Sequence, residues 1–372
     1  MSTILDATHP LVDGRTADAP LVRASRGLRS ETLPVWFMRQ AGRSLPEYRK
    51  LREGVAMLDS CLRPEMASEI TLQPVRRHGV DGAVFFSDIV VPLKLVGIDV
   101  DIVPGRGPVF PDPVRDAAGV REFAARVRGE TTPEVFAPIV EAVRRTVAEL
   151  GSTPLIGFAG APFTLAAYLV EGGPSKDHLR ARGLMVGEPE AWSELATAIG
   201  ELSAAFLEAQ IGAGASVVQL FDSWAGSLSR ERYLESVAPS SRIPLERAAT
   251  FATPDGERIR SIHFGVGTGE LLADMHATGG DVQGVDDRIP LDEAARRLPG
   301  VPLQGNIDPA VLFAGDEVRA RHVRDVVRRG AAAPAHIVNL GHGVPPEADP
   351  QVLTRLVELV HSLPGSGEVE SA

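Results

Sequence analysis

The chain has 372 residues, of which 44% are apolar and 23% charged, and its 38 basic and 49 acidic residues give a formal net charge of −11. This acidic balance argues against a nucleic-acid binder, because sequence-independent attraction to phosphates needs a broad basic face. The single cysteine, Cys61, excludes an internal disulfide framework and a multi-cysteine metal site, and it suits a reducing compartment.

The two ends of the chain carry no strong pattern. We expect residues 1–28 to form a flexible N-terminal segment and residues 364–372 to form a disordered tail. The first residues lack the basic leader and apolar run of a signal peptide, and no stretch reaches the roughly 20 apolar residues that a membrane-spanning helix needs. The sequence therefore predicts a cytoplasmic protein without a membrane partner.

Short apolar runs alternate with helix-period segments between these ends. The runs are rich in β-branched and aromatic residues, which is typical of strands, and several of the helical segments open with a proline that suits a first helical turn. The predicted strands are 35–38, 83–86, 155–158, 217–221, 262–264, 282–285, 301–304 and 337–340. The predicted helices include 64–77, 133–150, 189–211, 270–277 and 350–363.

Eight alternating units of this kind predict an α/β fold with a parallel sheet covered on both faces. They favour a single-domain (β/α)₈ TIM barrel over residues 29–363 rather than an open doubly wound sheet, whose first strand leads directly into a Gly-rich phosphate turn. We interpret the longer segments 91–112 and 240–257 as excursions from the barrel.

The active site of such a barrel lies where its strands end, so the polar residues after each run are the candidates. Among them are Arg39, Arg43, Asp88, Asp222, Ser223, Gly265, Asp286, Asn306 and His342.

The loop after the first predicted strand is a basic cluster in an acidic chain. Arg39 and Arg43 flank Gly42, which lets a backbone approach a ligand, and guanidinium groups match carboxylates bidentately. A capping box over 44–47 predicts a helix start just beyond the loop. The alternative is a pair of surface arginines, one of them paired with Glu47, for a contribution of about 0–1 kcal/mol. Spacing alone leaves both interpretations open.

The other candidates also have two interpretations each. Asp88 either caps the end of its strand or holds a charge in an apolar pocket, where it would stabilise a cation. Tyr168 is either a core residue or a contact for a bulky ligand, since small residues precede it. Ser223 lies outside a Gly-x-Ser-x-Gly elbow, so we expect hydrogen bonding rather than nucleophilic attack. His342, between two glycines, is either a loop residue or a ligand contact.

Five blocks together resemble the uroporphyrinogen decarboxylase family, and the resemblance spans roughly residues 28–363. They are 38–43, 86–88, 157–173, 221–223 and 340–343. The resemblance implies a (β/α)₈ enzyme, usually a homodimer, that removes the four acetate carboxylates of uroporphyrinogen III without a cofactor and yields coproporphyrinogen III. One departure is Ser44, where many relatives carry an aromatic residue, and it puts one local pocket contact in doubt.

The resemblance also implies roles for the matching residues. Arg39 and Arg43 would bind substrate carboxylates, and Asp88 would face the pyrrole nitrogens and stabilise the developing charge. Arg39 is in addition a candidate proton donor, although a group with a pKa above about 12 is a poor general acid near pH 7. The remaining substrate contacts would be the backbone of Gln40, Ala41 and Gly42 and the side chains of Tyr168, Ser223 and His342.

Two alternative functions would require different residues. A zinc-dependent methyltransferase acting on a corrinoid or a thiol shares the barrel, but its site resembles one ligated by His and two Cys, which Cys61 alone cannot supply. A non-catalytic tetrapyrrole carrier would keep the arginines but need not keep Asp88, Tyr168 and His342.

Overall fold

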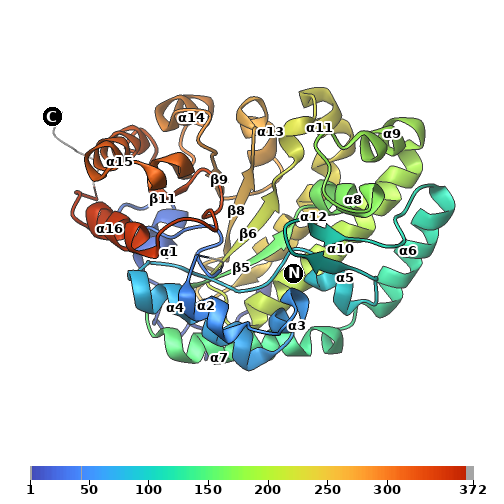
Figure 1. Ribbon diagram of the computed structural model, residues 1–372, viewed down its shortest axis with the longest axis horizontal. Helices are drawn as coiled ribbons and strands as arrows, with labels where there is room; N and C mark the ends of the chain where they lie inside the picture. Colours follow the sequence, from blue (N-terminus) through green and yellow to red (C-terminus); the bar gives the residue numbers. More distant parts are fainter. Residues whose placement is uncertain (1, 43, 366–372) are drawn as a thin grey trace.

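The computed structural model describes residues 2–42 and 44–365. Seven parallel strands form one curved sheet in the order β11-β10-β9-β8-β6-β5-β2, and helices surround it (Figure 1). Every residue of β5, β10 and β11 is buried, as expected for strands covered on both faces. The strands are β2 (Ala83–Val84), β5 (Leu155–Gly160), β6 (Val217–Asp222), β8 (Arg260–Gly265), β9 (Val282–Gly284), β10 (Leu303–Ile307) and β11 (His336–Leu340).

The eighth position of the barrel is filled by residues 34–38, which do not form a regular strand. Val35 makes a parallel bridge with Val338 of β11, whose N–H donates to the carbonyl of Pro34 at 2.8 Å. On the opposite side, the N–H of Asp81, just before β2, donates to the carbonyl of Val35 at 2.8 Å. The chain therefore closes between β11 and β2, and the predicted TIM-barrel-like α/β fold is confirmed.

A side chain completes this closure. The Gln40 Oε1 atom accepts a hydrogen bond from the Phe37 N–H at 2.9 Å, and its Nε2 atom donates to the Gly82 carbonyl at 2.8 Å. Gln40 is fully buried. It thus supplies, from one amide, the acceptor and the donor that a regular strand would have offered at this point.

All five predicted helices are present, and α4, α7, α8, α10 and α16 carry a proline in the first turn, where an N–H has no intrahelical partner. The α-helices are α1 (Pro20–Ser25), α2 (Pro46–Leu51), α3 (Met57–Cys61), α4 (Pro64–His78), α5 (Val91–Leu95), α6 (Ala117–Glu130), α7 (Ala137–Leu150), α8 (Pro162–Glu171), α9 (Leu179–Gly187), α10 (Pro189–Ala213), α11 (Arg230–Ser236), α12 (Ala238–Ala249), α13 (Leu272–His276), α14 (Leu291–Arg297), α15 (Asp316–Gly330) and α16 (Pro350–His361). Short 3₁₀ helices are η1 (Pro133–Phe136), η2 (Ala225–Ser227), η3 (Gly269–Leu271) and η4 (Pro309–Phe313). No helix of the described residues is long and apolar enough to span a bilayer.

The N-terminal residues pack onto the barrel. Strand β1 (Thr3–Ile4) pairs in parallel with β7 (Phe251–Ala252), and α1 buries Leu21 completely. The Thr16 and Ser216 hydroxyls lie 2.9 Å apart and share a hydrogen bond. The expectation of a flexible segment over 1–28 does not account for this packing, because the contacts come from residues far away in sequence. The predicted tail 364–372 falls mostly outside the described residues, and Gly365 still donates its N–H to the carbonyl of Glu31.

One of the two predicted excursions is wrong in part. Segment 91–112 does leave the barrel, through α5 and the antiparallel pair of β3 (Asp101–Val103) and β4 (Gly107–Val109). Residues 240–249, however, belong to α12, a barrel helix that packs against α10. The helix continues through this stretch although it contains Pro244, and it buries Ser240, Ser241, Leu245 and Ala248.

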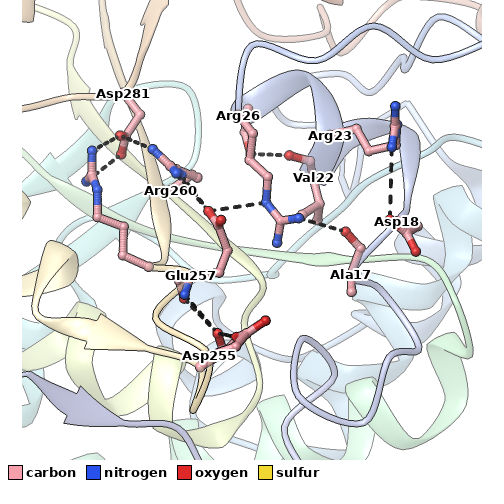
Figure 2. Close-up of polar contacts among 12 residues, drawn as sticks. Ala17, Asp18, Val22, Arg23, Arg26, Asp255, Glu257, Arg260 and Asp281 are labelled. Carbon is pink, nitrogen blue, oxygen red and sulfur yellow. Dashed lines mark hydrogen bonds and ion pairs between the residues drawn. The ribbon is translucent and has the colours of Figure 1, made fainter.

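The amino ends of β8 and β9 carry a network of ion pairs, away from the strand ends that form the candidate site (Figure 2). Asp281 is only 5% exposed at its side chain and pairs with Arg258 and with Arg260, the latter at 3.2 Å. Glu257 pairs with Arg260 at 2.7 Å and with Arg26, which follows α1, at 3.4 Å. The network therefore ties the N-terminal helix to the base of the barrel.

Candidate active site

Arg39 has an unusual backbone conformation at the end of the eighth barrel segment. Its φ angle is +62°, in the left-handed region that non-glycine residues seldom adopt and that clusters at functional sites. Strand β11 and the loop after it fix the preceding residue, since Asn339 Oδ1 of β11 accepts the Met38 N–H at 3.1 Å and Val344 of the loop donates its N–H to the Met38 carbonyl at 2.8 Å. The turn at Arg39 is thus imposed by β11.

The same loop makes room for the Arg39 side chain. A Cβ atom at Gly343 would lie 2.6 Å from Arg39 Cδ, so only glycine lets the arginine stem cross here. Arg39 is exposed, and its guanidinium makes no ion pair within the described part of the chain. Glu47, the alternative partner, is instead held by Arg77 through two contacts of 2.6 Å. Arg39 is therefore not the partner of Glu47, and the other arginine of that alternative, Arg43, lies outside the described residues.

The rest of this loop agrees only in part with the predictions made from the sequence. The predicted capping box at 44–47 is wrong: α2 begins at Pro46 with Leu45 as N-cap and no side-chain cap, because Glu47 is engaged by Arg77. The Gln40 side chain points into the barrel wall, so only the backbone of residues 40–42 remains a candidate for contact with a ligand. Arg43 lies outside the described residues.

Asp88 follows β2 and is half-buried. Its Oδ1 atom accepts a hydrogen bond from the Val90 N–H at 3.1 Å, so its interpretation as a loop cap is confirmed. Its charge also reaches Tyr168: burial and, to a smaller extent, the Asp88 charge raise the pKa of that phenol to about 12, against the opposing effect of Arg39. The charges of Asp88 and Arg39 therefore both reach Tyr168 at the same end of the barrel.

His342 lies at this end as well, in the loop after β11. Its imidazole is reached by solvent but is crowded by protein atoms, and this crowding together with the Arg39 charge lowers its pKa, against the opposing effect of Asp287. Partial burial raises the pKa of Asp287 itself, and the nearby Asp308 and Asp286 add to the rise. The sequence did not single out Asp287, which directly follows the strand-end residue Asp286.

Ser223 is half-buried immediately after β6. It lies between a buried carboxyl group, Asp222, and a stacked aromatic ring, Trp224. Asp222 is fully buried, and this burial raises its pKa to about 7 against a hydrogen bond from Thr164. On the other side, the Trp224 ring stacks on Tyr168 with ring centroids 3.9 Å apart. Trp224 and Thr164 were missed in the sequence, where the only signal was the position of Trp224 next to a strand-end serine.

Three other strand-end candidates hold loops together. The Asn306 Nδ2 atom donates to the carbonyls of Asp286 at 2.7 Å and of Ile289 at 2.6 Å. Asp286 is buried, and its Oδ2 atom accepts the Gly267 N–H at 2.6 Å. A Cβ atom at Gly265 would lie 3.0 Å from the Asp222 carbonyl oxygen. The side chains of Asn306 and Asp286 thus hold the loops behind the site, and Gly265 allows two strands to approach closely.

The described residues contain no group of three or more His, Cys, Asp or Glu side chains arranged to hold a metal ion. Cys61 is buried, which raises the pKa of its thiol well above the usual range, and the Asp88 charge adds to this effect. The thiol therefore stays protonated near neutral pH and is a poor metal ligand.

Comparisons with known proteins agree on one family. A family model described as uroporphyrinogen decarboxylase (URO-D) matches residues 16–363. A protein from Leifsonia xyli subsp. xyli with that name is 62% identical over 370 residues, covering 96% of this chain and 98% of its own length. One from Arthrobacter sp., with the same name, is 62% identical over 353 residues, covering 95% and 99%. A solved methyltransferase from Methanosarcina mazei has a TM-score of 0.73 at 14% identity, covering 93% of this chain and 98% of its own, and shows the fold alone.

Proposed function

This chain belongs to the uroporphyrinogen decarboxylase family and is a carboxy-lyase, and we propose that it converts uroporphyrinogen III to coproporphyrinogen III by removing four acetate carboxylates as CO₂. The observation that carries the assignment of the site is the convergence of Arg39, Asp88 and Tyr168, from three separate barrel units, at the carboxyl ends of the strands.

Arg39 suits the recognition of the substrate. The substrate is a polyanion with eight carboxylates, and an exposed guanidinium without an ion pair among the described residues is available to bind one of them bidentately. The left-handed backbone and the close approach over Gly343 fix where this arginine stem leaves the barrel. We assign the same role to Arg43 from the family resemblance.

Asp88 suits the chemistry. In the proposed reaction a proton adds to a pyrrole ring carbon and gives a cationic ring. The bond to the carboxylate then breaks, its electron pair neutralises the ring, and CO₂ leaves. A proton adds to the exposed methylene carbon and the ring proton departs, so each acetate becomes a methyl group with a net uptake of one proton. Asp88 stabilises the cationic ring electrostatically, and the substrate is its own electron sink.

The remaining residues bind and orient the substrate. The phenol of Tyr168, with a pKa of about 12, keeps its proton near neutral pH and can donate a hydrogen bond. His342 has a lowered pKa and is mostly neutral there, so it offers one donor and one acceptor. Ser223 adds a hydroxyl at the end of β6. We keep Arg39 as the candidate proton donor.

We also propose, from the family resemblance, that the enzyme is a cytoplasmic homodimer that works without a cofactor. Sedimentation of the purified protein would test the dimer: a single species of about twice the chain mass is expected, and a monomer at micromolar concentration would contradict it.

The decisive experiment is anaerobic incubation with uroporphyrinogen III, followed by separation of the products by their number of carboxylates. We expect intermediates with seven, six and five carboxylates and a final product with four. Binding of the substrate without loss of CO₂ would point instead to a carrier. Methyl transfer from a corrinoid or a thiol donor by the same preparation would point to the methyltransferases that share the barrel.

A further inference from the structure

Both residues that flank Ser223 are tied to helix α8. The Thr164 hydroxyl donates a hydrogen bond to Asp222 Oδ1 at 2.9 Å. The same hydroxyl oxygen accepts a hydrogen bond from the Trp224 N–H at 3.3 Å. One hydroxyl group therefore bridges the residues before and after Ser223, and its donor and acceptor capacities are both in use.

A second connection runs through aromatic rings. Tyr168 lies four residues after Thr164, one turn further along α8, so the two side chains share a face of the helix. The Tyr168 ring stacks on the Trp224 indole with centroids 3.9 Å apart and an interplanar angle of 33°. The imidazole of His178, which is 3% exposed, packs against the same indole at 4.2 Å. The Trp224 indole that packs on Tyr168 is therefore itself fixed by His178.

We propose that Thr164, Asp222 and Trp224 form a two-point lock between β6 and α8 that positions Ser223 and Tyr168 for the substrate. One arm of the β6–α8 lock is the hydrogen-bonded hydroxyl of Thr164, and the other is the stack of Trp224 on Tyr168. The three residues are positioning residues, because they act through Ser223 and Tyr168. The inference rests on the proposed function, in which Ser223 and Tyr168 contact the substrate.

The burial of Asp222 supports this lock. A fully buried carboxyl group is costly to keep unless hydrogen bonds satisfy it. Within the described residues its Oδ2 atom has no hydrogen-bond partner, so the contact between Thr164 and Oδ1 is its main side-chain contact. Such a group is expected where it fixes a specific geometry, and here the geometry fixed is that of the chain on either side of Ser223.

The first test removes the hydroxyl and leaves the shape. We expect Thr164→Val to lower kcat/KM for uroporphyrinogen III about tenfold, whereas Thr164→Ser, which keeps the hydroxyl, stays within about twofold of the wild type. The matched control is Thr146→Val. Thr146 is also buried on a helix and donates to a carbonyl four residues earlier at 2.7 Å, but it lies on α7. Wild-type kcat/KM in Thr164→Val, or equal losses in the Val and Ser variants, would overturn the hydrogen-bond arm.

The second test uses Trp224, which is half-buried and packs against the edge of the core. We expect Trp224→Ala to lower kcat/KM about fivefold in the wild type but less than twofold in a Tyr168→Ala background, because the ring that it positions is then absent. Equal losses in both backgrounds would overturn the lock and leave the Tyr168 contact standing. A Tyr168→Ala enzyme with wild-type kinetics would overturn that contact, and with it the lock.

Discussion

Asp88 combines a local hydrogen bond with a charge that reaches the neighbouring barrel unit, and the two roles can be separated. We expect Asp88→Asn to keep the bond to the Val90 N–H, since an amide oxygen also accepts, but to lose the charge. Turnover should fall about 100-fold or more, as when a preorganised charge-stabilising group is removed, with little change in KM. Steady-state kinetics with uroporphyrinogen III would measure this split.

The control for Asp88→Asn is Asp349→Asn. Asp349 accepts the N–H of Gln351 in the same i to i+2 geometry, but it caps α16. This variant should retain wild-type turnover. Near-normal decarboxylation by Asp88→Asn would exclude a charge-stabilising role for Asp88.

The close approach of the Arg39 side chain to Gly343 gives a second prediction about single residues. Gly343→Ala would place a methyl group 2.6 Å from Arg39 Cδ and displace the arginine. We expect KM for uroporphyrinogen III to rise about tenfold, which corresponds to about 1.4 kcal/mol, and Arg39→Ala to raise it at least as much.

Gly212→Ala is the matched control, because a Cβ atom there meets nothing within 4 Å and the residue is inside α10. Its kinetics should stay at the wild-type level. A Gly343→Ala enzyme with unchanged KM would show that the position of Arg39 does not matter for binding.

At the scale of elements, the barrel closure depends on the amide of Gln40. Gln40→Leu would leave the buried Phe37 N–H and Gly82 carbonyl without partners, and each orphaned group costs about 1–3 kcal/mol. We expect a clear fall in the urea midpoint. Gln73→Leu is the control, since Gln73 is also buried but its Oε1 atom has no partner among the described residues. Equal effects of the two variants would mean that Gln40 merely fills space.

Sequence patterns predicted the elements wherever the cause of structure is local. The apolar run at 155–158 becomes a fully buried strand, and Pro350 opens α16, whose buried residues recur at helical spacing. They failed where the cause is distant. Residues 35–38 were predicted as a strand, yet the Gln40 side chain replaces part of the strand ladder there, and the capping box at 44–47 loses Glu47 to Arg77, thirty residues away.

The candidate site follows the same division. Strand ends can be predicted from the sequence, so Arg39, Asp88, Ser223 and His342 could be selected as candidates by their position. The contact of Thr164 with Asp222 joins residues 58 positions apart and leaves no local pattern. Such pairs become visible only when the barrel brings α8 beside β6.

At the scale of the whole molecule, the pKa shifts of buried histidines predict a loss of stability in acid. Burial lowers the pKa of His78, His263 and His336 from 6.5 to about 4, so the folded state binds fewer protons than the unfolded state between these values. Their contribution to stability is complete above about pH 6.5 and is lost as the pH falls toward 4, by about 1.4 kcal/mol per pH unit for each histidine. The raised pKa values of His361 beside Asp81 and of the buried Asp222 act in the opposite sense.

We therefore expect the urea midpoint of the full chain to fall steeply between pH 6.5 and 4.5. His263→Gln should lower the midpoint at pH 8 but flatten this dependence, because one titrating group is gone. A midpoint that is constant across this range in the wild type would show that these histidines are not held neutral in the folded protein.

The seam at which the barrel closes also positions Arg39, the arginine that we propose to bind the substrate, because residues 34–38 run directly into it. A ligand that binds only the folded state adds its binding free energy to the stability of what it holds. Binding of the substrate is then expected to stabilise the closed seam, and closure of the seam to favour binding of the substrate. The Trp36 amide, which donates to the Val338 carbonyl at 3.3 Å, should exchange its hydrogen more slowly in the loaded enzyme than in the empty one.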